Sequence, residues 1–188
     1  MDLPGWLFAL LVLALFAWYL SFSASRIDRL HHRVEGARSA LDAQLVRRAE
    51  AAVELATSGA LDPATGLLVA GAAADALAAG EGEQVDEHVR ETAESDLSRA
   101  LQVALDSEQV AALGQDAVAR LLLERLQASC HRVQLARRFH NDAVTDATRV
   151  RAKLIARWAR LAGRAAAPQT FEMDDDPPVA LTRSPAVW

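Results

Sequence analysis

The chain has 188 residues, of which 52% are apolar and 24% charged, and its formal net charge is −5. This length accommodates one domain and a short appendage. The mildly acidic balance excludes bulk attraction to nucleic acid, so no nucleic-acid partner is expected. Cys130 is the only cysteine, which excludes an intrachain disulfide. The Ala- and Leu-rich composition, with 5% aromatic residues, is typical of closely packed helices.

The first segment, residues 3–22, carries no charged side chain. About twenty helical residues cross the hydrocarbon core of a bilayer, so we predict a single transmembrane anchor over residues 1–24. Its apolar ends and interfacial aromatic rings are Leu3, Trp6, Trp18, Tyr19 and Phe22. A cleaved signal peptide is the alternative, with Ser21 and Ser23 as small residues near a cleavage site. The absence of a basic stretch before the apolar run favours the anchor.

Basic residues are distributed unequally around this segment. Four arginines follow it closely, and no Lys or Arg precedes it: Arg26, Arg29, Arg33 and Arg38. Loops rich in Lys and Arg stay on the cytoplasmic side of a membrane. We therefore expect a single-pass protein of the cell membrane, with its N-terminus outside and its C-terminal domain in the cytoplasm. The lipid bilayer is its first expected partner, and the arginines could also contact anionic headgroups.

Apolar residues then recur every three or four positions, which predicts amphipathic helices. The expected elements are a helix over 25–58, a second over 63–80, a third over 83–106, a short turn over 110–113 and a long helix over 116–161. The second and third could form one bent helix across 80–82. Short loops between long helices favour antiparallel neighbours. We thus predict an all-α fold: an antiparallel bundle of three to four long helices over residues 25–164, followed by a disordered acidic, Pro-rich tail over 165–188.

Motifs for catalysis or cofactor binding are not found in the sequence. It contains no HExxH, GxSxG, Walker or GxGxxG pattern. His31 and His32 are adjacent and would point about 100° apart, which excludes a shared metal from one helix. We expect no enzyme activity, cofactor or metal, with a metal site assembled across helices as the alternative. His140 falls on a buried seam and Cys130 is expected to pack as a small apolar group, with pH or redox sensing as the alternatives.

Two stretches carry a resemblance to a known family. The first contains Gln44, Leu45, Arg47 and Arg48; the second contains Ala136, Arg137, Arg138, Phe139, Asn141 and Val144. Behind an N-terminal apolar span, these resemble the "QLxRR" and "ARRxYNxxV" motifs of the LemA family. His140 stands where that family usually has tyrosine, so the chain resembles a divergent, actinobacterial-type branch.

The LemA resemblance implies a membrane-anchored antiparallel helical bundle and does not imply a reaction. The arginine motifs could meet acidic residues such as Glu50, Glu54 or Asp142 and fix the helix register, or could form a docking patch. We expect a non-enzymatic scaffold or interaction module whose protein partners are not named by the sequence. The alternative is an accessory subunit of a membrane enzyme such as a protease.

Overall fold

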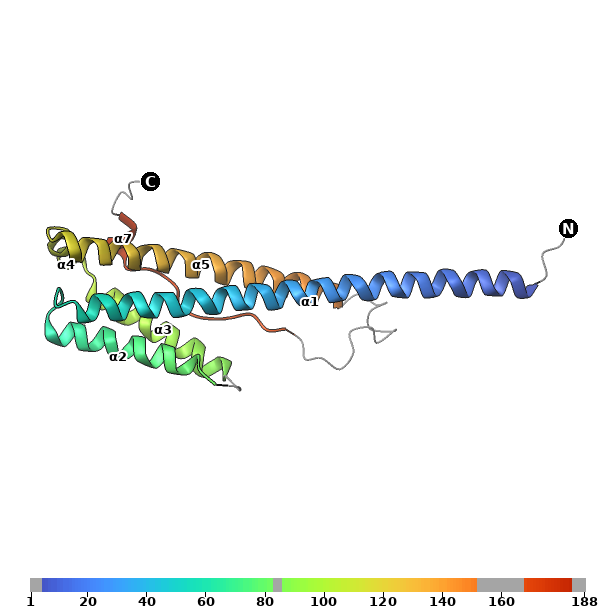
Figure 1. Cartoon of the computed structure of the whole chain (residues 1–188), viewed down its shortest axis with the longest axis horizontal. Helices are drawn as coiled ribbons and strands as arrows, with labels where there is room; N and C mark the ends of the chain where they lie inside the picture. Colours follow the sequence, from blue (N-terminus) through green and yellow to red (C-terminus); the bar gives the residue numbers. More distant parts are fainter. Residues whose placement is uncertain (1–4, 83–85, 152–167, 184–188) are drawn as a thin grey trace. The chain divides into compact units, whose positions relative to one another are not determined.

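The computed structural model describes residues 5–82, 86–151 and 168–183, without the side chains of 7–9, 17, 20–28, 151 and 183. Every element in these ranges is an α-helix (Figure 1), which confirms the predicted all-α class. The helices are α1 Gly5–Thr57, α2 Pro63–Ala79, α3 Glu87–Ala104, α4 Ser107–Leu113, α5 Ala117–Arg151 and α7 Val179–Arg183. The predicted continuation of the last long helix over 152–161 lies outside the described residues, as do residues 165–167 and 184–188 of the predicted tail.

The chain forms two compact units. The N-terminal unit comprises Met1–Ala37 and His140–Thr170, and the bundle unit comprises Arg38–Phe139 and Phe171–Trp188. Each unit is thus built from a part of α1 and a later part of the chain.

The ends of α2 and α3 follow from residues that the sequence already marks. Gly59 adopts a positive φ of 79° after α1, a conformation that suits glycine. The Asp62 side chain accepts the backbone N–H groups of Ala64 and Thr65, and hydrogen bonds from Thr65 lower the pKa of this carboxyl group. Asp86 caps α3 in the same way. The second and third helices are therefore separate and do not form one bent helix.

Contacts within the bundle unit define an up-down-up-down topology. Glu54 of α1 pairs with Arg125 of α5, whereas Leu41 and Leu45, nearer the start of α1, pack with Val133, further along α5. Residue numbers rise on one helix as they fall on the other, so α1 and α5 are antiparallel. Gly66 of α2 lies against Ala56 of α1, and α2 packs beside α3. The predicted antiparallel bundle is confirmed for this unit.

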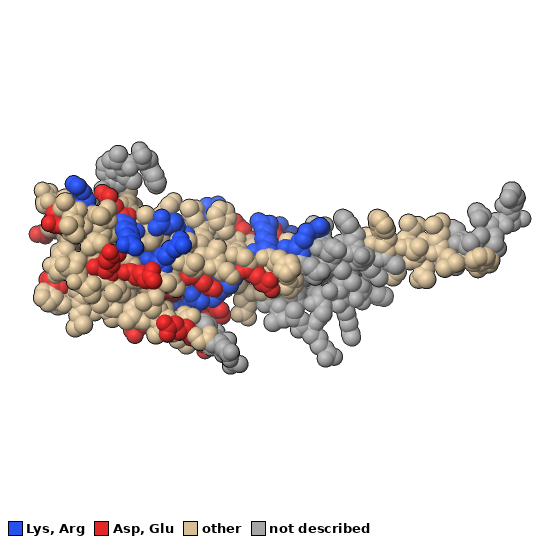
Figure 2. Space-filling model, viewed as in Figure 1, with Lys and Arg blue, Asp and Glu red and all other residues tan. Residues whose placement is uncertain are grey.

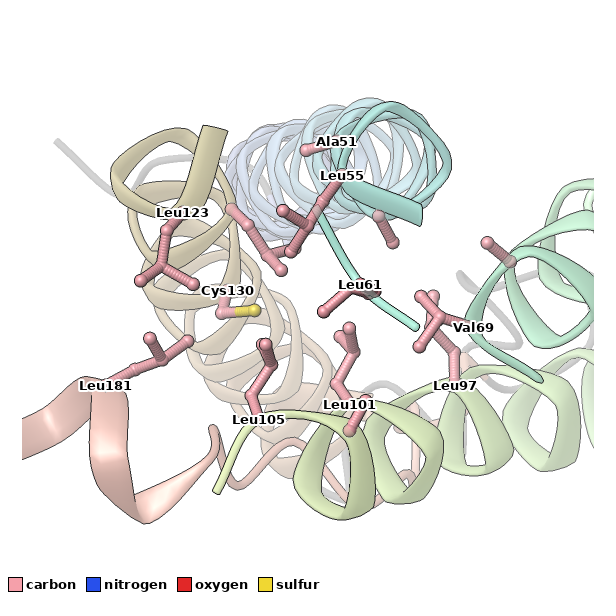
Figure 3. Packing of buried hydrophobic residues seen from close by; sticks show 14 of the residues in the cluster. Ala51, Leu55, Leu61, Val69, Leu97, Leu101, Leu105, Leu123, Cys130 and Leu181 are labelled. Carbon is pink, nitrogen blue, oxygen red and sulfur yellow. The ribbon is translucent and has the colours of Figure 1, made fainter. Parts of the chain in front are cut away.

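The core of the bundle unit is built from small and branched aliphatic side chains. Figure 3 shows residues of α1, α2, α3, α5 and α7 converging, with Leu61 from the α1–α2 loop between them. Leu55, Leu97 and Leu126 are fully buried, and alanines occupy many of the remaining core positions. Alanine at these positions lets the helix axes approach closely, as the composition predicts.

The C-terminal segment departs from expectation. The prediction of a disordered tail after residue 164 is wrong for residues 171–183, because this segment packs within the bundle unit. Phe171 and Leu181 are buried, and Leu181 belongs to the main core. The acidic and proline-rich composition suggested disorder, but the few apolar side chains of the segment supply enough buried surface to hold it.

In the N-terminal unit, large apolar side chains of α1 are exposed. Trp6, Trp18 and Tyr19 are exposed, while Leu3 and the side chain of Phe22 lie outside the described residues. Figure 2 shows no charged side chain along the described part of this stretch. Within the described part of the chain, no helix combines the length and the apolarity that a membrane crossing requires.

Two glycines of α2 provide a matched test of this packing. A Cβ on Gly66 would lie 2.9 Å from the backbone oxygen of Ala56, whereas a Cβ on Gly71 would meet nothing within 4 Å. We expect Gly66→Ala to lower the free energy of unfolding by about 1–2 kcal/mol through overpacking. Gly71→Ala should raise it by about 0.5–1 kcal/mol through helix propensity. Urea denaturation measures both, and equal effects of the two substitutions would contradict the close α1–α2 contact.

Candidate functional site

A buried ion pair joins α1 to α3 inside the bundle unit. Arg48 Nη2 lies 2.5 Å from Glu94 Oε2, and the two side chains are only 3% and 2% exposed. The same nitrogen donates to the Glu94 carbonyl oxygen at 3.0 Å, and Nη1 donates to Ser98 Oγ at 2.9 Å. Charge-assisted hydrogen bonds of this kind offset the cost of taking both ions out of water. The pair fixes the axial position of α3 on α1.

A second charged group lies toward the start of α3. Asp42 Oδ1 is 3.0 Å from Arg90 Nη1 and 3.2 Å from Arg38 Nε, and Arg38 Nη2 donates to both Glu87 oxygens. The Arg38 guanidinium also lies over the Phe171 ring, 4.9 Å from its centroid. Arg38 thus connects α1, α3 and the C-terminal segment.

Polar side chains of α3 bind the backbone of the C-terminal segment. The stripe consists of residues at helical spacing: Glu91, Ser95, Ser98 and Gln102. Glu91 accepts the N–H of Glu172 at 2.7 Å, and Ser95 accepts the N–H of Asp174 at 3.1 Å. Ser98 donates to the carbonyl oxygen of Asp174 at 2.6 Å, and Gln102 donates to that of Asp176 at 2.8 Å. The α3 stripe therefore satisfies an extended backbone that forms no regular structure of its own.

Helix α5 holds the same segment from the other side. Arg137 donates to both carboxylate oxygens of Asp175, at 2.7 and 2.8 Å, and Gln134 donates to the Asp175 carbonyl oxygen at 3.0 Å. Phe171 and Met173 enter a small apolar cluster with Leu41, Leu45 and Val133. Two apolar anchors and one bidentate carboxylate thus seat residues 171–176 between α3 and α5.

The residues of the "QLxRR" and "ARRxYNxxV" stretches take different places. Arg48 is buried in the ion pair and Leu45 in the core, whereas Arg47 is exposed. Gln44 is half-buried, and its side-chain oxygen receives no hydrogen bond from any described residue. The structure pairs Arg48 with α3; the expected acidic partners, Glu50, Glu54 and Asp142, are not its partners.

The second stretch divides between the two units. In the bundle unit, Arg137 binds Asp175, Ala136 is half-buried, and Arg138 and Phe139 are exposed. In the N-terminal unit, Asn141 is half-buried and Val144 is buried. The motif is therefore not a single patch, and Arg137 acts in the docking of the C-terminal segment.

The arginines expected to determine topology also differ from one another. Arg29 and Arg33 are exposed, and Arg33 lies 3.5 Å from Asp146 within the N-terminal unit. Arg38 belongs to the charged group at the start of α3. The side chain of Arg26 lies outside the described residues.

His140 and Cys130 are both buried, as their helical positions predict. His140 Nε2 is 3.3 Å from the carbonyl oxygen of Gln169 within the N-terminal unit. Burial raises the pKa of the Cys130 thiol, although nearby Arg48 acts in the opposite direction. Since the thiolate is the reactive form, a buried thiol with a raised pKa is a poor redox sensor.

A shallow cleft of about 450 Å³ lies beside this network, lined by Asp42, Ala43, Val46, Arg47, Glu50, Gly80 and Arg90. Arg47 and Arg90 are matched there by the carboxylates of Asp42 and Glu50. The cleft therefore has no net charge that would attract a charged ligand. Among the described residues, no group of three or more His, Cys, Asp or Glu is arranged to hold a metal ion.

Sequence reasoning missed Glu94, the α3 stripe and Asp175. Glu94 had a detectable signal, because it falls between core positions Leu97 and Arg90 on the buried face of α3. The serines of the stripe gave a weaker signal: Ser95 and Ser98 lie on the same buried face of α3, beside Leu97 and Leu101. Asp175 could not be assigned, because nothing in the acidic run distinguishes it from its neighbours.

No protein-family model matches the chain, and searches of the curated proteins and of the solved structures gave no match. Any functional assignment therefore depends on the residues and geometry of this chain.

The buried pair is tested by removing one charge or both. Arg48→Met leaves the Glu94 carboxylate buried without its partner, so we expect a loss of about 3–5 kcal/mol in the free energy of unfolding. Arg48→Met with Glu94→Leu should recover much of that loss. Arg99→Met is the control, because Arg99 and Asp96 form an exposed pair and should contribute less than about 1 kcal/mol. Chemical denaturation measures all three, and a double variant no more stable than Arg48→Met would contradict the assignment.

Proposed function

We propose that this chain is a membrane-anchored helical scaffold of the LemA type, with a non-enzymatic interaction module at the inner face of the cell membrane. The observation that carries the proposal is the surface of the N-terminal part of α1. Leu10, Leu11, Val12 and Leu13 are consecutive and all exposed. Successive helical residues point about 100° apart, so these four side chains cover the whole circumference.

A helix that is apolar on every side is typical of a membrane span or a protein core. No described part of the N-terminal unit covers these side chains, which supports a lipid environment for residues 3–22. The exposed arginines behind them, Arg29 and Arg33, support retention of the following residues on the cytoplasmic side.

The packing of the bundle unit supports a scaffold role. Its interior holds mostly Ala and Leu side chains and a buried ion pair, and its cleft is shallow with balanced charges. Such a unit presents surfaces more readily than it encloses a substrate. The resemblance in the "QLxRR" and "ARRxYNxxV" stretches supports the LemA assignment.

Alkaline carbonate extraction of membranes tests the anchor. We expect the full chain to remain in the membrane pellet. Val12→Asp with Phe16→Asp should release it, because each charge at the centre of a span costs about 2.5–3.5 kcal/mol. The same charges at Val103 and Val118, which are exposed on the bundle unit, should leave the chain in the pellet. Release of the unsubstituted chain would refute the anchor. The orientation is tested separately by a reporter that fluoresces only in the cytoplasm, fused after Trp188; absence of fluorescence would refute it.

A further inference from the structure

Helix α2 is apolar on both of its sides. Val69, Ala73 and Ala76 are buried against the core, as the topology requires. The opposite side remains exposed and carries two leucines, with Leu67 76% exposed and Leu68 50% exposed. The other exposed residues on this side include Ala64, Gly71, Ala74, Asp75 and Ala78. We call the surface formed by Ala64, Leu67, Leu68, Gly71, Ala74, Asp75 and Ala78 the α2 face.

An exposed stripe of this kind marks a contact surface. These positions recur every three or four residues along one side of the helix, so they form a continuous strip. Surface apolar residues that occur singly need no explanation, but a continuous apolar strip is typical of an interaction site. Small residues between Leu67 and the end of α2 would allow a second helix to approach the backbone closely.

The charges around the α2 face determine which partner fits it. Residues 61–82, which comprise α2 and its flanking turns, contain no Lys or Arg, and they contain three acidic residues: Asp62, Asp75 and Glu81. Helix α2 therefore adds no blue atoms to the surface in Figure 2. Asp62 caps α2, whereas Asp75 on the α2 face and Glu81 just past the end of α2 are exposed and form no ion pair with any described residue.

We propose that the α2 face docks a basic amphipathic helix of a partner protein, with its apolar side on Leu67 and Leu68 and its Lys or Arg side chains near Asp75 and Glu81. Helix-on-helix docking of this kind combines apolar burial with charge complementarity. The acidic surroundings disfavour two other occupants. Anionic lipid would be repelled, and a second copy of α2 would bring like charges together.

The inference deepens the proposed scaffold function, because it names the kind of partner that the scaffold would hold. Its test uses the full chain in nanodiscs of zwitterionic lipid and two synthetic helical peptides. Both peptides carry the same leucine stripe; one has Lys at the remaining positions and the other has Glu. Empty nanodiscs provide the baseline, so binding to the α2 face is read separately from membrane association.

We expect saturable binding of the Leu/Lys peptide, at least about tenfold tighter than that of the Leu/Glu peptide. Leu67→Ser with Leu68→Ser should weaken it by about tenfold or more, because two exposed leucines lose their apolar contact. Val103→Ser with Val118→Ser, at equally exposed sites on α3 and α5, should leave it unchanged. Asp75→Lys should weaken the Leu/Lys peptide and strengthen the Leu/Glu peptide.

Three results would overturn the proposal. The Leu67/Leu68 double variant could bind the Leu/Lys peptide as tightly as the unsubstituted chain, or both peptides could bind equally. Sedimentation could instead reveal a dimer that the double variant abolishes, which would assign the α2 face to a second copy. If the carbonate test fails, the same two peptides are titrated against the full chain free in solution, because the α2 face does not include residues 3–22. Failure of the anchor and failure of the α2 face are thereby told apart.

Discussion

Arg48 on α1 and Glu94 on α3 carry opposite charges inside a core that is built mostly from alanine and leucine. Neither ion is tolerable there without the other, so the two helices are held at one relative position along their axes. Apolar packing between alanine-rich helices only weakly fixes the position of one helix along the axis of its neighbour, because small side chains interdigitate weakly. The ion pair removes that freedom, and the remaining polar contacts of the bundle unit depend on the position it sets.

The most direct consequence concerns the C-terminal segment. Ser98 accepts a hydrogen bond from Arg48 and donates one to the carbonyl oxygen of Asp174. The buried pair and the docked segment are therefore parts of one network, which continues through Arg137 and Asp175 to α5. In this way residues 171–176 close the bundle unit between α3 and α5 without forming a helix or a strand. The α2 face lies outside this network and stays available to a partner.

The helices could be predicted from the sequence because their signals are local. Apolar spacing, the Asp62–Pro63 start and the glycines at 59 and 114 place the end of α1, α2 and the end of α4 correctly, and the burial of His140 also follows from spacing. The start of α1 was expected near residue 25, whereas the helix begins at Gly5. The partner of Arg48 could not be predicted, because it depends on which helix lies beside α1. The packing of residues 171–183 was missed for a related reason. Phe171 and Leu181 are too few to give a periodic pattern, and their burial requires surfaces that exist only after the bundle forms.

Hydrogen–deuterium exchange at single residues tests the docking of the C-terminal segment most directly. The backbone N–H groups of Glu172 and Asp174 lie in a segment without secondary structure, yet they donate to Glu91 and Ser95 of α3. We predict that both amides exchange slowly in the full chain, with protection approaching that of Leu97 in the core of α3. Exchange of these two amides at the rate of a free peptide, while Leu97 stays protected, would contradict a network that joins the buried ion pair to this segment.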